Sequence, residues 1–560
     1  MSVVPVLSAR LAAASVAAFG LTVDPELRAA TKPEFGHFQT SLALRLAKQL
    51  EQSPREIAEQ LVAHADLGDL GRLEIAGPGF VNVTLLPGTL ADGVNNPIHG
   101  RPGAGKRVVV DYSQPNVAKQ MHVGHLRSTV IGDALCNVLA YAGYVVVRQN
   151  HVGDWGTQFG MMVEQLLAEG IPAERLDLEE MQQLYQRSRR HFDSDPAFAD
   201  LSRRRVVLLQ SGDFETRGIW QQLVDISLAE FDRVYAMLGS PLTQADVVGE
   251  SAYNADLPAI VDELQAAGLL TESNGAQCAF LPGFTGRDGS PLPVIVRKSD
   301  GGFGYSATDL AAVRHRVRDL HADRTVYVVD HRQTLHFQQI FALARAANWL
   351  PETTTAEHVA FGTVLGPDGR PFKTRDGGTV YLVSLLDAAV ARAAALLADR
   401  DGIDRDAVAA AVGIGAIKYA DLSSDRTNDY VFDLDRMVAM TGNTGPYLQY
   451  AHARLTRLLA KAGTSDSKVT TLDDPAEQRL ALLLAGFDAA VLQVAETLQP
   501  HRLCTYLYDV ATALSAFYES CPVLTSEGET RTSRLALCGA TRAVLHDGLT
   551  LLGMTAPDAM

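Results

Sequence analysis

Residues 114–135 read QPNVAKQMHVGHLRSTVIGDAL and place two histidines, His122 and His125, three positions apart with a glycine between them. The preceding residues, KRVVVDYS (106–113), form a β-branched run after a Gly- and Pro-rich stretch, which predicts a buried strand. The following residues, LRSTVIGDALCNVLAYAG (126–143), have apolar side chains at helical spacing and end at a glycine, which predicts a helix. The histidines therefore lie where a strand passes into a helix, where backbone N–H groups and the helix dipole favour a bound anion.

The composition is that of a globular protein with several domains. The chain has 560 residues, which exceeds a single core and predicts three or four domains, with 47% hydrophobic and 20% charged residues. No run of about 18 apolar residues occurs, so we expect no membrane-spanning segment. The first turns lack a basic start and carry Arg10 within the apolar stretch, so an amphipathic helix is expected there rather than a signal peptide.

The net charge and the cysteine pattern indicate which binding partners and which cellular compartment to expect for this protein. The net charge of −16 excludes a basic protein but leaves room for a local basic face. The five cysteines are scattered and form no CxxC pair. This pattern argues against a disulfide framework or a structural zinc site and favours a reducing compartment, so we expect a cytoplasmic protein.

Strand and helix signals alternate in the central part of the chain, which predicts an α/β fold with a doubly wound parallel sheet. The strand candidates are RVVVDYS, YVVVRQNHVG, PLPVIVRKS and TVYVVDH, and PGTLADGVNNPIHGRPGAGK reads as a linker. The expected organisation is an N-terminal α+β domain (1–90), a linker (91–105), the α/β domain (106–390) with a helical insertion at about 160–245, a connecting helical segment (391–440) and an all-α helical bundle (441–560).

The two histidines allow more than one interpretation. A zinc site would need a third ligand, and none lies at a suggestive spacing, so no metal site is expected. A helix cap or a satisfied core pair is the ordinary alternative for such histidines. Gly124 favours a nucleotide instead, because a missing side chain between two donors lets a flat group such as adenine approach the backbone. Donors aimed at a developing phosphate charge lower a reaction barrier.

Five stretches together resemble one enzyme family. HVGH after a strand resembles the HIGH signature of class I aminoacyl-tRNA synthetases, and the wider phrase DYSQPNVAKQMHVGHLRSTVIGDAL resembles arginyl-tRNA synthetases. Four further stretches follow in the family's order: NHVGDWGTQFG (150–160), VVGESAYN (247–254), VDHRQTLHFQQIF (329–341) and TGNTGPYLQYAHAR (441–454). The resemblance implies a monomeric ATP-dependent arginine–tRNA ligase. Its parts would be a Rossmann-like, HIGH-type catalytic domain, an N-terminal domain that contacts tRNA(Arg) and a helical anticodon-binding domain.

An arginine site needs carboxylates, because the guanidinium is a planar fork of five donors that pairs with them bidentately. Tyr305 and Asp309 are four residues apart and share one face of a predicted helix. By resemblance to the family, Asp309 and Glu250 engage the guanidinium and Tyr305 frames the pocket. Asn116 and Gln333 hold the amino-acid end of the substrate.

The resemblance also assigns the ATP site. The loop that often carries a catalytic lysine in class I enzymes corresponds to PDGRPFKTRDGGTVYLVSLL (367–386), where Asp376 stands at the usual lysine position. Family members with an altered loop use a lysine at the place of Lys119, which makes Lys119 a catalytic candidate beside the two histidines. Mg²⁺ is expected to arrive with ATP rather than in a dedicated protein site. The residues expected to bind ATP are His122, Gly124, His125, Lys119 and Lys373.

A basic stripe opens the C-terminal helices. Arg454, Arg457 and Lys461 fall at i, i+3 and i+7, with Tyr447 and Tyr450 close by in the sequence. Such a stripe is often only a solvated helix face. The resemblance favours tRNA binding, with the aromatic rings available for base stacking, and it implies that adenylate formation needs bound tRNA.

Two other functions stay open from the sequence. A small-molecule nucleotidyltransferase can also carry an HxGH segment, but it would leave the N-terminal domain and the C-terminal helices without a role. A non-catalytic paralogue acting as a binding module is the second, and the intact His122, Gly124 and His125 argue against it.

Overall fold

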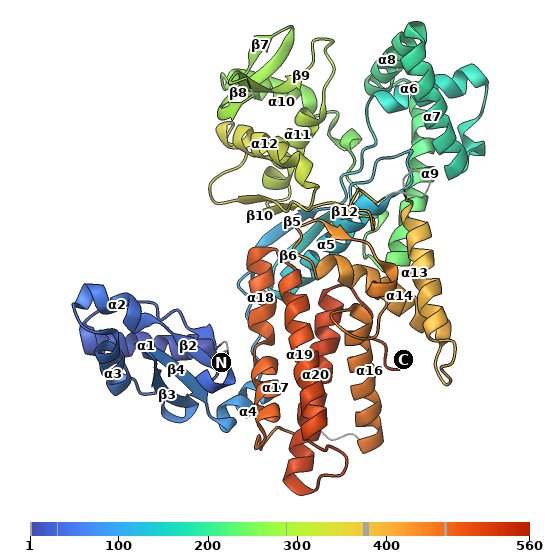
Figure 1. Cartoon of the computed structure of the whole chain (residues 1–560). Helices are drawn as coiled ribbons and strands as arrows, with labels where there is room; N and C mark the ends of the chain where they lie inside the picture. The colour runs from blue at the N-terminus through green and yellow to red at the C-terminus, as the bar shows by residue number, and fades with distance from the viewer. Residues whose placement is uncertain (1–2, 31, 287, 373–379, 464–466) are drawn as a thin grey trace.

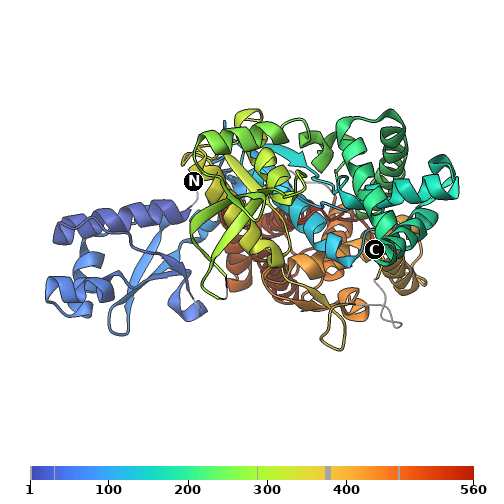
Figure 2. The same ribbon diagram turned by 90° about the horizontal axis from the view of Figure 1, so that it is seen from above.

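The computed structural model describes the whole chain except residues 1–2, 31, 287, 373–379 and 464–466. A small N-terminal domain, a central domain with two lobes above its sheet and a C-terminal helical bundle follow one another (Figure 1). Seen from above, the N-terminal domain projects from one side of the remaining protein (Figure 2). The α/β class with an α+β domain before it and an all-α bundle after it is therefore confirmed.

The N-terminal domain packs helices on one antiparallel sheet with strand order β1-β2-β4-β3. The N-terminal stretch forms a helix as expected, and α1 buries Leu7, Leu11 and Ala14, but the helix is apolar on its exposed face as well, where Val16 lies, and is therefore not strongly amphipathic. The elements are α1 (Val3–Phe19), β1 (Arg28–Ala29), β2 (Phe38–Thr40), α2 (Leu42–Leu50), α3 (Pro54–His64), β3 (Gly71–Ala76) and β4 (Phe80–Leu85).

The central domain is built on a four-stranded parallel sheet with the order β11-β10-β5-β6. The chain leaves β5 towards β6 on one side and returns to β10 and β11 on the other, which is the doubly wound arrangement. Three valines of β5 are fully buried, in keeping with the continuous apolar run of its sequence. The elements are β5 (Arg107–Asp111), α5 (Val123–Tyr141), β6 (Val145–Gln149), β10 (Arg324–Tyr327) and β11 (Thr355–His358).

One predicted strand does not belong to this sheet. PLPVIVRKS was expected among the parallel strands, but its residues form β9 (Pro291–Arg297) in a separate antiparallel sheet of order β7-β8-β9. Residues of β9 alternate towards the core in its second half, with Val294 and Val296 buried and Ile295 exposed. This alternation is typical of an antiparallel sheet with one solvated face. The other strands of this sheet are β7 (Thr271–Ser273) and β8 (Ala276–Thr285).

Helices form the two lobes above the sheet. One lobe contains α6–α9, in the range where the sequence predicts a helical insertion, and the other contains the antiparallel sheet with α10–α12 (Figure 1). The helices are α6 (Thr157–Glu169), α7 (Leu178–Ser194), α8 (Pro196–Ser211), α9 (Phe214–Leu238), α10 (Leu257–Ala266), α11 (Tyr305–Arg318) and α12 (Thr334–Ala346).

The stretch that reads as a linker begins with a helix, α4 (Pro87–Asn95). Pro87 occupies the first helical position, where its missing N–H costs nothing, and Leu90 and Ala91 are buried. The helix packs on α17 (Pro475–Ala485), and a Cβ on Gly93 would lie 2.9 Å from that of Ala485. The glycines that suggest a linker thus permit close helix packing, and tertiary contacts override low helix propensity.

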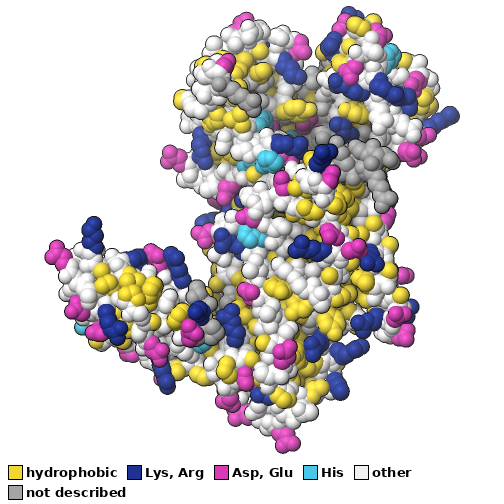
Figure 3. All heavy atoms as spheres, viewed as in Figure 1, with side chains coloured by type: hydrophobic (Ala, Val, Ile, Leu, Met, Phe, Trp, Pro, Cys, Tyr) yellow, Lys and Arg dark blue, Asp and Glu magenta, His cyan; other side chains and the backbone are white. Residues whose placement is uncertain are grey.

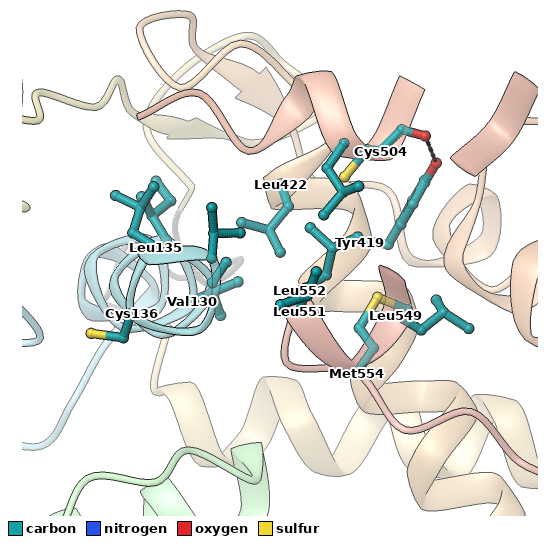
Figure 4. Packing of buried hydrophobic residues seen from close by; sticks show 14 of the residues in the cluster. Val130, Leu135, Cys136, Tyr419, Leu422, Cys504, Leu549, Leu551, Leu552 and Met554 are labelled. Atoms are coloured by element: carbon teal, nitrogen blue, oxygen red, sulfur yellow. Dashed lines mark hydrogen bonds between the residues drawn. The ribbon is translucent and has the colours of Figure 1, made fainter. Parts of the chain in front are cut away.

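The C-terminal bundle packs directly on the central domain. Figure 4 shows Val130 of α5 near Leu422 of α14 and Leu552 at the end of α20, within one continuous core. Among the described residues, no single helix is long and apolar enough to cross a membrane. Only the bent pair α17–α18 has, taken together, the length and composition of a membrane-spanning segment. The remaining elements are β12 (Val364–Leu365), α13 (Leu382–Leu396), α14 (Arg405–Leu422), β13 (Tyr430–Val431), α15 (Leu434–Met437), α16 (Gly445–Ala462), α18 (Phe487–Thr497), α19 (His501–Ser520) and α20 (Gly528–Leu551).

A glycine sets how closely α5 lies on the sheet. A Cβ on Gly132 would come within 2.2 Å of two ring atoms of the buried Tyr112. We expect Gly132→Ala to lower the free energy of unfolding by about 1–3 kcal/mol through overpacking. In the control Gly539→Ala, where nothing lies within 4 Å, the substitution gains about 0.5–1 kcal/mol from helix propensity. Thermal melting of both variants measures the two effects, and equal shifts of one sign would contradict this packing.

Candidate active site

The site lies where the strand order of the parallel sheet reverses. Strands β5 and β10 are neighbours, yet the chain runs outward from them in opposite directions. Ligands of doubly wound sheets bind in the crevice beyond the carboxyl ends of such strands. Residues 112–122 follow β5 and residues 328–333 follow β10, so both predicted segments meet there. Histidine and basic side chains are visible in the hollow between the two lobes (Figure 3).

The two histidines cap α5 reciprocally. His122 is the N-cap residue, and its Nδ1 accepts the backbone N–H of Gly124 at 3.0 Å. The Nδ1 of His125 accepts the backbone N–H of His122, also at 3.0 Å. An accepting nitrogen carries no proton, so each neutral ring bears its hydrogen on Nε2. The helix-cap alternative is thus correct for the Nδ1 atoms, and it leaves one Nε2–H donor on each ring for a ligand.

Both rings stay neutral near pH 7. Burial lowers the pKa of His125 to about 3, and the charges of His122 and Lys119 add to the shift. Burial, Lys119 and Arg332 lower the pKa of His122. The pair therefore supplies hydrogen-bond donors, and Lys119 supplies positive charge beside them.

The loop expected to bind the ATP phosphates is only partly described. Lys373 and Asp376 lie outside the described residues. Residues 381–382, which follow this loop, pair with the histidine segment. The Leu382 N–H donates to the Met121 carbonyl at 2.9 Å, and the backbones of Tyr381 and His122 form an isolated antiparallel β-bridge. The sequence after the loop is thus joined by backbone hydrogen bonds to the start of α5.

The predicted guanidinium pocket brings carboxylates together. Asp309 of α11 contacts His336, with Nε2 and Oδ2 2.5 Å apart, and lies 3.9 Å from Nε2 of His151. Glu250 is 8% exposed and accepts the backbone N–H of Trp155. Burial raises the pKa of Glu250 to about 8, and the carboxylates of Asp309 and Asp154 add to the shift.

The outer wall of this pocket is open. Tyr305, at the first position of α11, is 71% exposed. Partial desolvation raises its pKa, and the charges of Glu250 and Tyr185 add to the shift. The expected shared face of Tyr305 and Asp309 on one helix is confirmed.

Two polar side chains, Asn116 and Gln333, follow the carboxyl ends of β5 and β10. Asn116 is exposed, and its backbone pairs with Gly153 beyond the end of β6. A Cβ on Gly153 would lie 2.4 Å from Oδ1 of Asn116, so this glycine permits the close approach. Gln333 is exposed at the end of the 3₁₀ turn His331–Gln333, beyond β10. Among the described residues no group of three or more His, Cys, Asp or Glu side chains could hold a metal ion.

Three family models match the chain in sequence order. They describe the arginyl-tRNA synthetase N-terminal domain (residues 6–85), the class I (R) tRNA synthetase catalytic domain (residues 90–434) and the DALR anticodon-binding domain (residues 448–560). This chain belongs to the arginyl-tRNA synthetases. Within class I it is an ATP-dependent aminoacyl-tRNA ligase.

Relatives that match over their full length support the same family assignment. The chain is 54% identical over 576 residues to the arginine–tRNA ligase of Cutibacterium acnes, with 99% of this chain and 100% of the relative covered. It is 49% identical to that of Laribacter hongkongensis, with 100% of both covered. The solved arginyl-tRNA synthetase from Plasmodium falciparum superposes with a TM-score of 0.87 at 29% identity, covering 100% of this chain and 99% of that one. The Thermus thermophilus enzyme gives 0.83 at 27%, covering 99% and 100%.

The basic stripe of this synthetase lies on α16, in a region where Figure 3 shows Lys and Arg side chains on the bundle surface. Arg454, Arg457 and Lys461 are all exposed. The guanidinium of Arg454 lies over the ring of Tyr518, 4.3 Å from its centroid. The structure therefore places the three basic residues on a surface that a large ligand can reach.

The two tyrosines of that helix differ. Tyr450 is 39% exposed and can meet a ligand on the same helix. Tyr447 is half-buried, and its hydroxyl lies 3.2 Å from Ser515 Oγ of α19. The structure thus does not bring Tyr447 fully onto the exposed face.

Several residues at the synthetase site escaped the sequence reasoning. His336 lies three positions after Gln333 within one of the quoted stretches, and helical spacing alone could have singled it out. Arg332 is near enough to lower the pKa of His122. Tyr185, in the insertion, carries no local signal.

With Glu250 as a guanidinium partner, as the sequence predicts, its raised pKa predicts a pH-dependent arginine affinity. Below about pH 8 this carboxyl is protonated in the free enzyme and must lose its proton to pair with a guanidinium. We expect the arginine KM to fall about tenfold between roughly pH 6.5 and 8.0, since each pH unit below a pKa changes the ionised fraction tenfold. Glu250→Gln should flatten this dependence while the ATP KM stays unchanged. A wild-type arginine KM that is constant over this range would contradict the assignment.

Proposed function

We propose that this synthetase activates arginine with ATP and transfers it to the 3′ end of tRNA(Arg), using the side chains at the carboxyl edge of the parallel sheet. The observation that carries the proposal is the pair of Nε2–H donors that the capping hydrogen bonds leave free at the start of α5, with Lys119 beside them. Glu250 and Asp309 supply two neighbouring carboxylates for the guanidinium.

In the first step a carboxylate oxygen of arginine forms a bond to the α-phosphorus of ATP. The bond from that phosphorus to the bridging oxygen breaks, and pyrophosphate leaves with the electron pair. Charge builds on phosphate oxygens, where His122 and His125 donate hydrogen bonds and Lys119 adds a positive charge. In the second step a ribose hydroxyl of the tRNA attacks the arginyl carbonyl carbon, and AMP leaves.

Arginine is selected by its guanidinium. Asp309 and Glu250 offer the carboxylates, Tyr305 covers the open side, and Asn116 and Gln333 bind the amino-acid end. A pocket built to hydrogen-bond a polar group rejects analogues that lack it by about 10⁴–10⁵ without editing. Lysine, with a single ammonium, cannot satisfy two carboxylates bidentately.

We further propose that the enzyme acts as a cytoplasmic monomer and that Mg²⁺ enters as part of the ATP substrate. The five cysteines are buried and unpaired, which suits a reducing compartment.

The test of the function is a charging assay with total tRNA and each of the twenty amino acids. We expect arginine alone to be attached, with tRNA-dependent pyrophosphate exchange. A small-molecule nucleotidyltransferase would charge no tRNA, and a non-catalytic paralogue would show neither activity.

Lys119 is the replacement for the missing loop lysine. We expect Lys119→Ala to lower kcat for arginine activation by about 10²-fold with little change in arginine affinity, because the charge acts mainly in the transition state. Lys373→Ala should cost less, and Asp376→Lys should partly restore Lys119→Ala. A larger loss from Lys373→Ala would transfer the role to the loop.

The basic stripe of α16 binds tRNA phosphates in this proposal. Neutralising Arg454, Arg457 or Lys461 should each reduce the slope of log K against log salt by about one unit. Filter binding of tRNA(Arg) at several salt concentrations measures the slope. The control is Arg318→Gln. Arg318 is an exposed arginine of the central domain, away from α16, and pairs there with Glu263, so this variant should leave the slope unchanged. An unchanged slope in all three stripe variants would limit α16 to a solvated surface.

A further inference from the structure

The ammonium of Lys119 rests on an aromatic ring of the insertion. Its Nζ lies 4.9 Å from the ring centroid of Tyr185, which α7 carries. Both side chains are half-buried, and no ion-pair partner of Lys119 is recorded among the described residues. An ammonium over a ring face is attracted by the ring quadrupole, and partial desolvation strengthens this attraction.

A ring differs from a carboxylate as a partner for this lysine. A carboxylate would neutralise the ammonium and weaken its attraction for phosphates. A ring orients the ammonium and leaves its full charge for a second partner. Lysine has a flexible four-carbon stem, so holding its end reduces the entropy lost when it meets a phosphate.

The backbone before Lys119 is also held by the insertion. Ala118 has φ 67, a left-handed conformation that non-glycine residues rarely adopt, so its neighbours must fix it. Its N–H donates to Ser227 Oγ of α9 at 3.0 Å. Ser227 and Tyr185 thus hold the main chain and the side chain of the same segment from two insertion helices.

The start of this loop is fixed in a similar way. Ser113 and Gln114 have φ values of 72 and 52. The hydroxyl of Tyr235, on α9, lies 2.7 Å from Ser113 Oγ and accepts Asn150 Nδ2 at 2.9 Å. Asn150 Oδ1 in turn accepts the N–H of Gln114 at 3.0 Å. The strained loop therefore depends on α9 at both ends.

We propose that Tyr185 is the positioning residue of Lys119, holding its ammonium beside His122 and His125 for the ATP phosphates, while Ser227 fixes the backbone that carries it. The inference rests on the phosphate-binding role proposed for Lys119. It gives the helical insertion a part in arginine activation that no pattern in its sequence indicates.

Three substitutions separate ring, hydroxyl and helix effects. Tyr185→Leu removes the ring and should lower kcat of pyrophosphate exchange with tRNA(Arg) present by about tenfold, with an unchanged arginine KM. Tyr185→Phe keeps the ring face and should stay within about twofold of wild type. Phe192→Leu is the matched control on α7, because that half-buried ring also lies under arginines, 5.7 Å from Arg189 and 5.3 Å from Arg203. It should leave kcat unchanged.

A second pair of variants tests the backbone contact. Ser227 and Ser188 are fully buried serines on insertion helices, and each donates to a carbonyl of its own helix. Only Ser227 also accepts a hydrogen bond from the Lys119 loop. Ser227→Ala should lower kcat with an unchanged arginine KM, whereas Ser188→Ala should not, at similar melting temperatures.

The outcomes distinguish this inference from the proposed function. If Lys119→Ala activates arginine at the wild-type rate, the phosphate role of Lys119 is wrong. If Lys119→Ala is impaired but Tyr185→Leu is not, only the positioning role is overturned. Equal losses from Tyr185→Phe and Tyr185→Leu, or a raised arginine KM, would also overturn it. In support, Tyr185→Leu should add little to Lys119→Ala, because both act on one group.

Discussion

Two backbone N–H groups at the start of α5 donate to imidazole nitrogens of His122 and His125. Much of the site depends on these two hydrogen bonds. Gly124 N–H and His122 N–H each donate to an Nδ1 atom, which caps the helix and sets the tautomer of both rings. The same hydrogen bonds leave the proton of each ring on Nε2, at the helix end where the dipole attracts an anion. Replacing either ring thus removes a helix-capping acceptor together with an Nε2–H donor.

Buried charged groups hold the neighbouring elements against this helix. Arg316 of α11 donates to Asp111 at the end of β5 and to Gln149 at the end of β6, and all three side chains are buried. Arg127 of α5 pairs with Asp421 of α14 at 3.2 Å, with both side chains almost fully buried. Breaking such a pair leaves a buried charge uncompensated, at a cost of about 3–5 kcal/mol. The two arginines therefore tie α11 to the parallel sheet and α14 to the histidine helix.

Sequence patterns suffice to predict where β5 passes into α5 and which types of residue line the site. The β-branched run before His122 and the apolar periodicity after it predict β5 and α5, because both signals lie within one continuous segment. The spacing of Tyr305 and Asp309 likewise predicts a shared helix face. A strand pattern does not tell which sheet the strand joins, as for β9, which pairs with its hairpin neighbour β8 outside the parallel sheet. Local patterns also fail for α4, whose glycines suit close packing on α17.

The arrangement of these residues in space depends on contacts between distant parts of the chain. The order of β10 beside β5 joins segments about 200 residues apart and creates the crevice between them. The tautomers of His122 and His125 follow from backbone hydrogen bonds, and the pKa of Glu250 follows from burial beside two other carboxylates. The contact of Lys119 with Tyr185 joins the loop before α5 to an insertion helix that has no motif of its own. Hydrogen-bond direction, desolvation and cation–π geometry depend on three-dimensional neighbours, and a sequence pattern records spacing only along the chain.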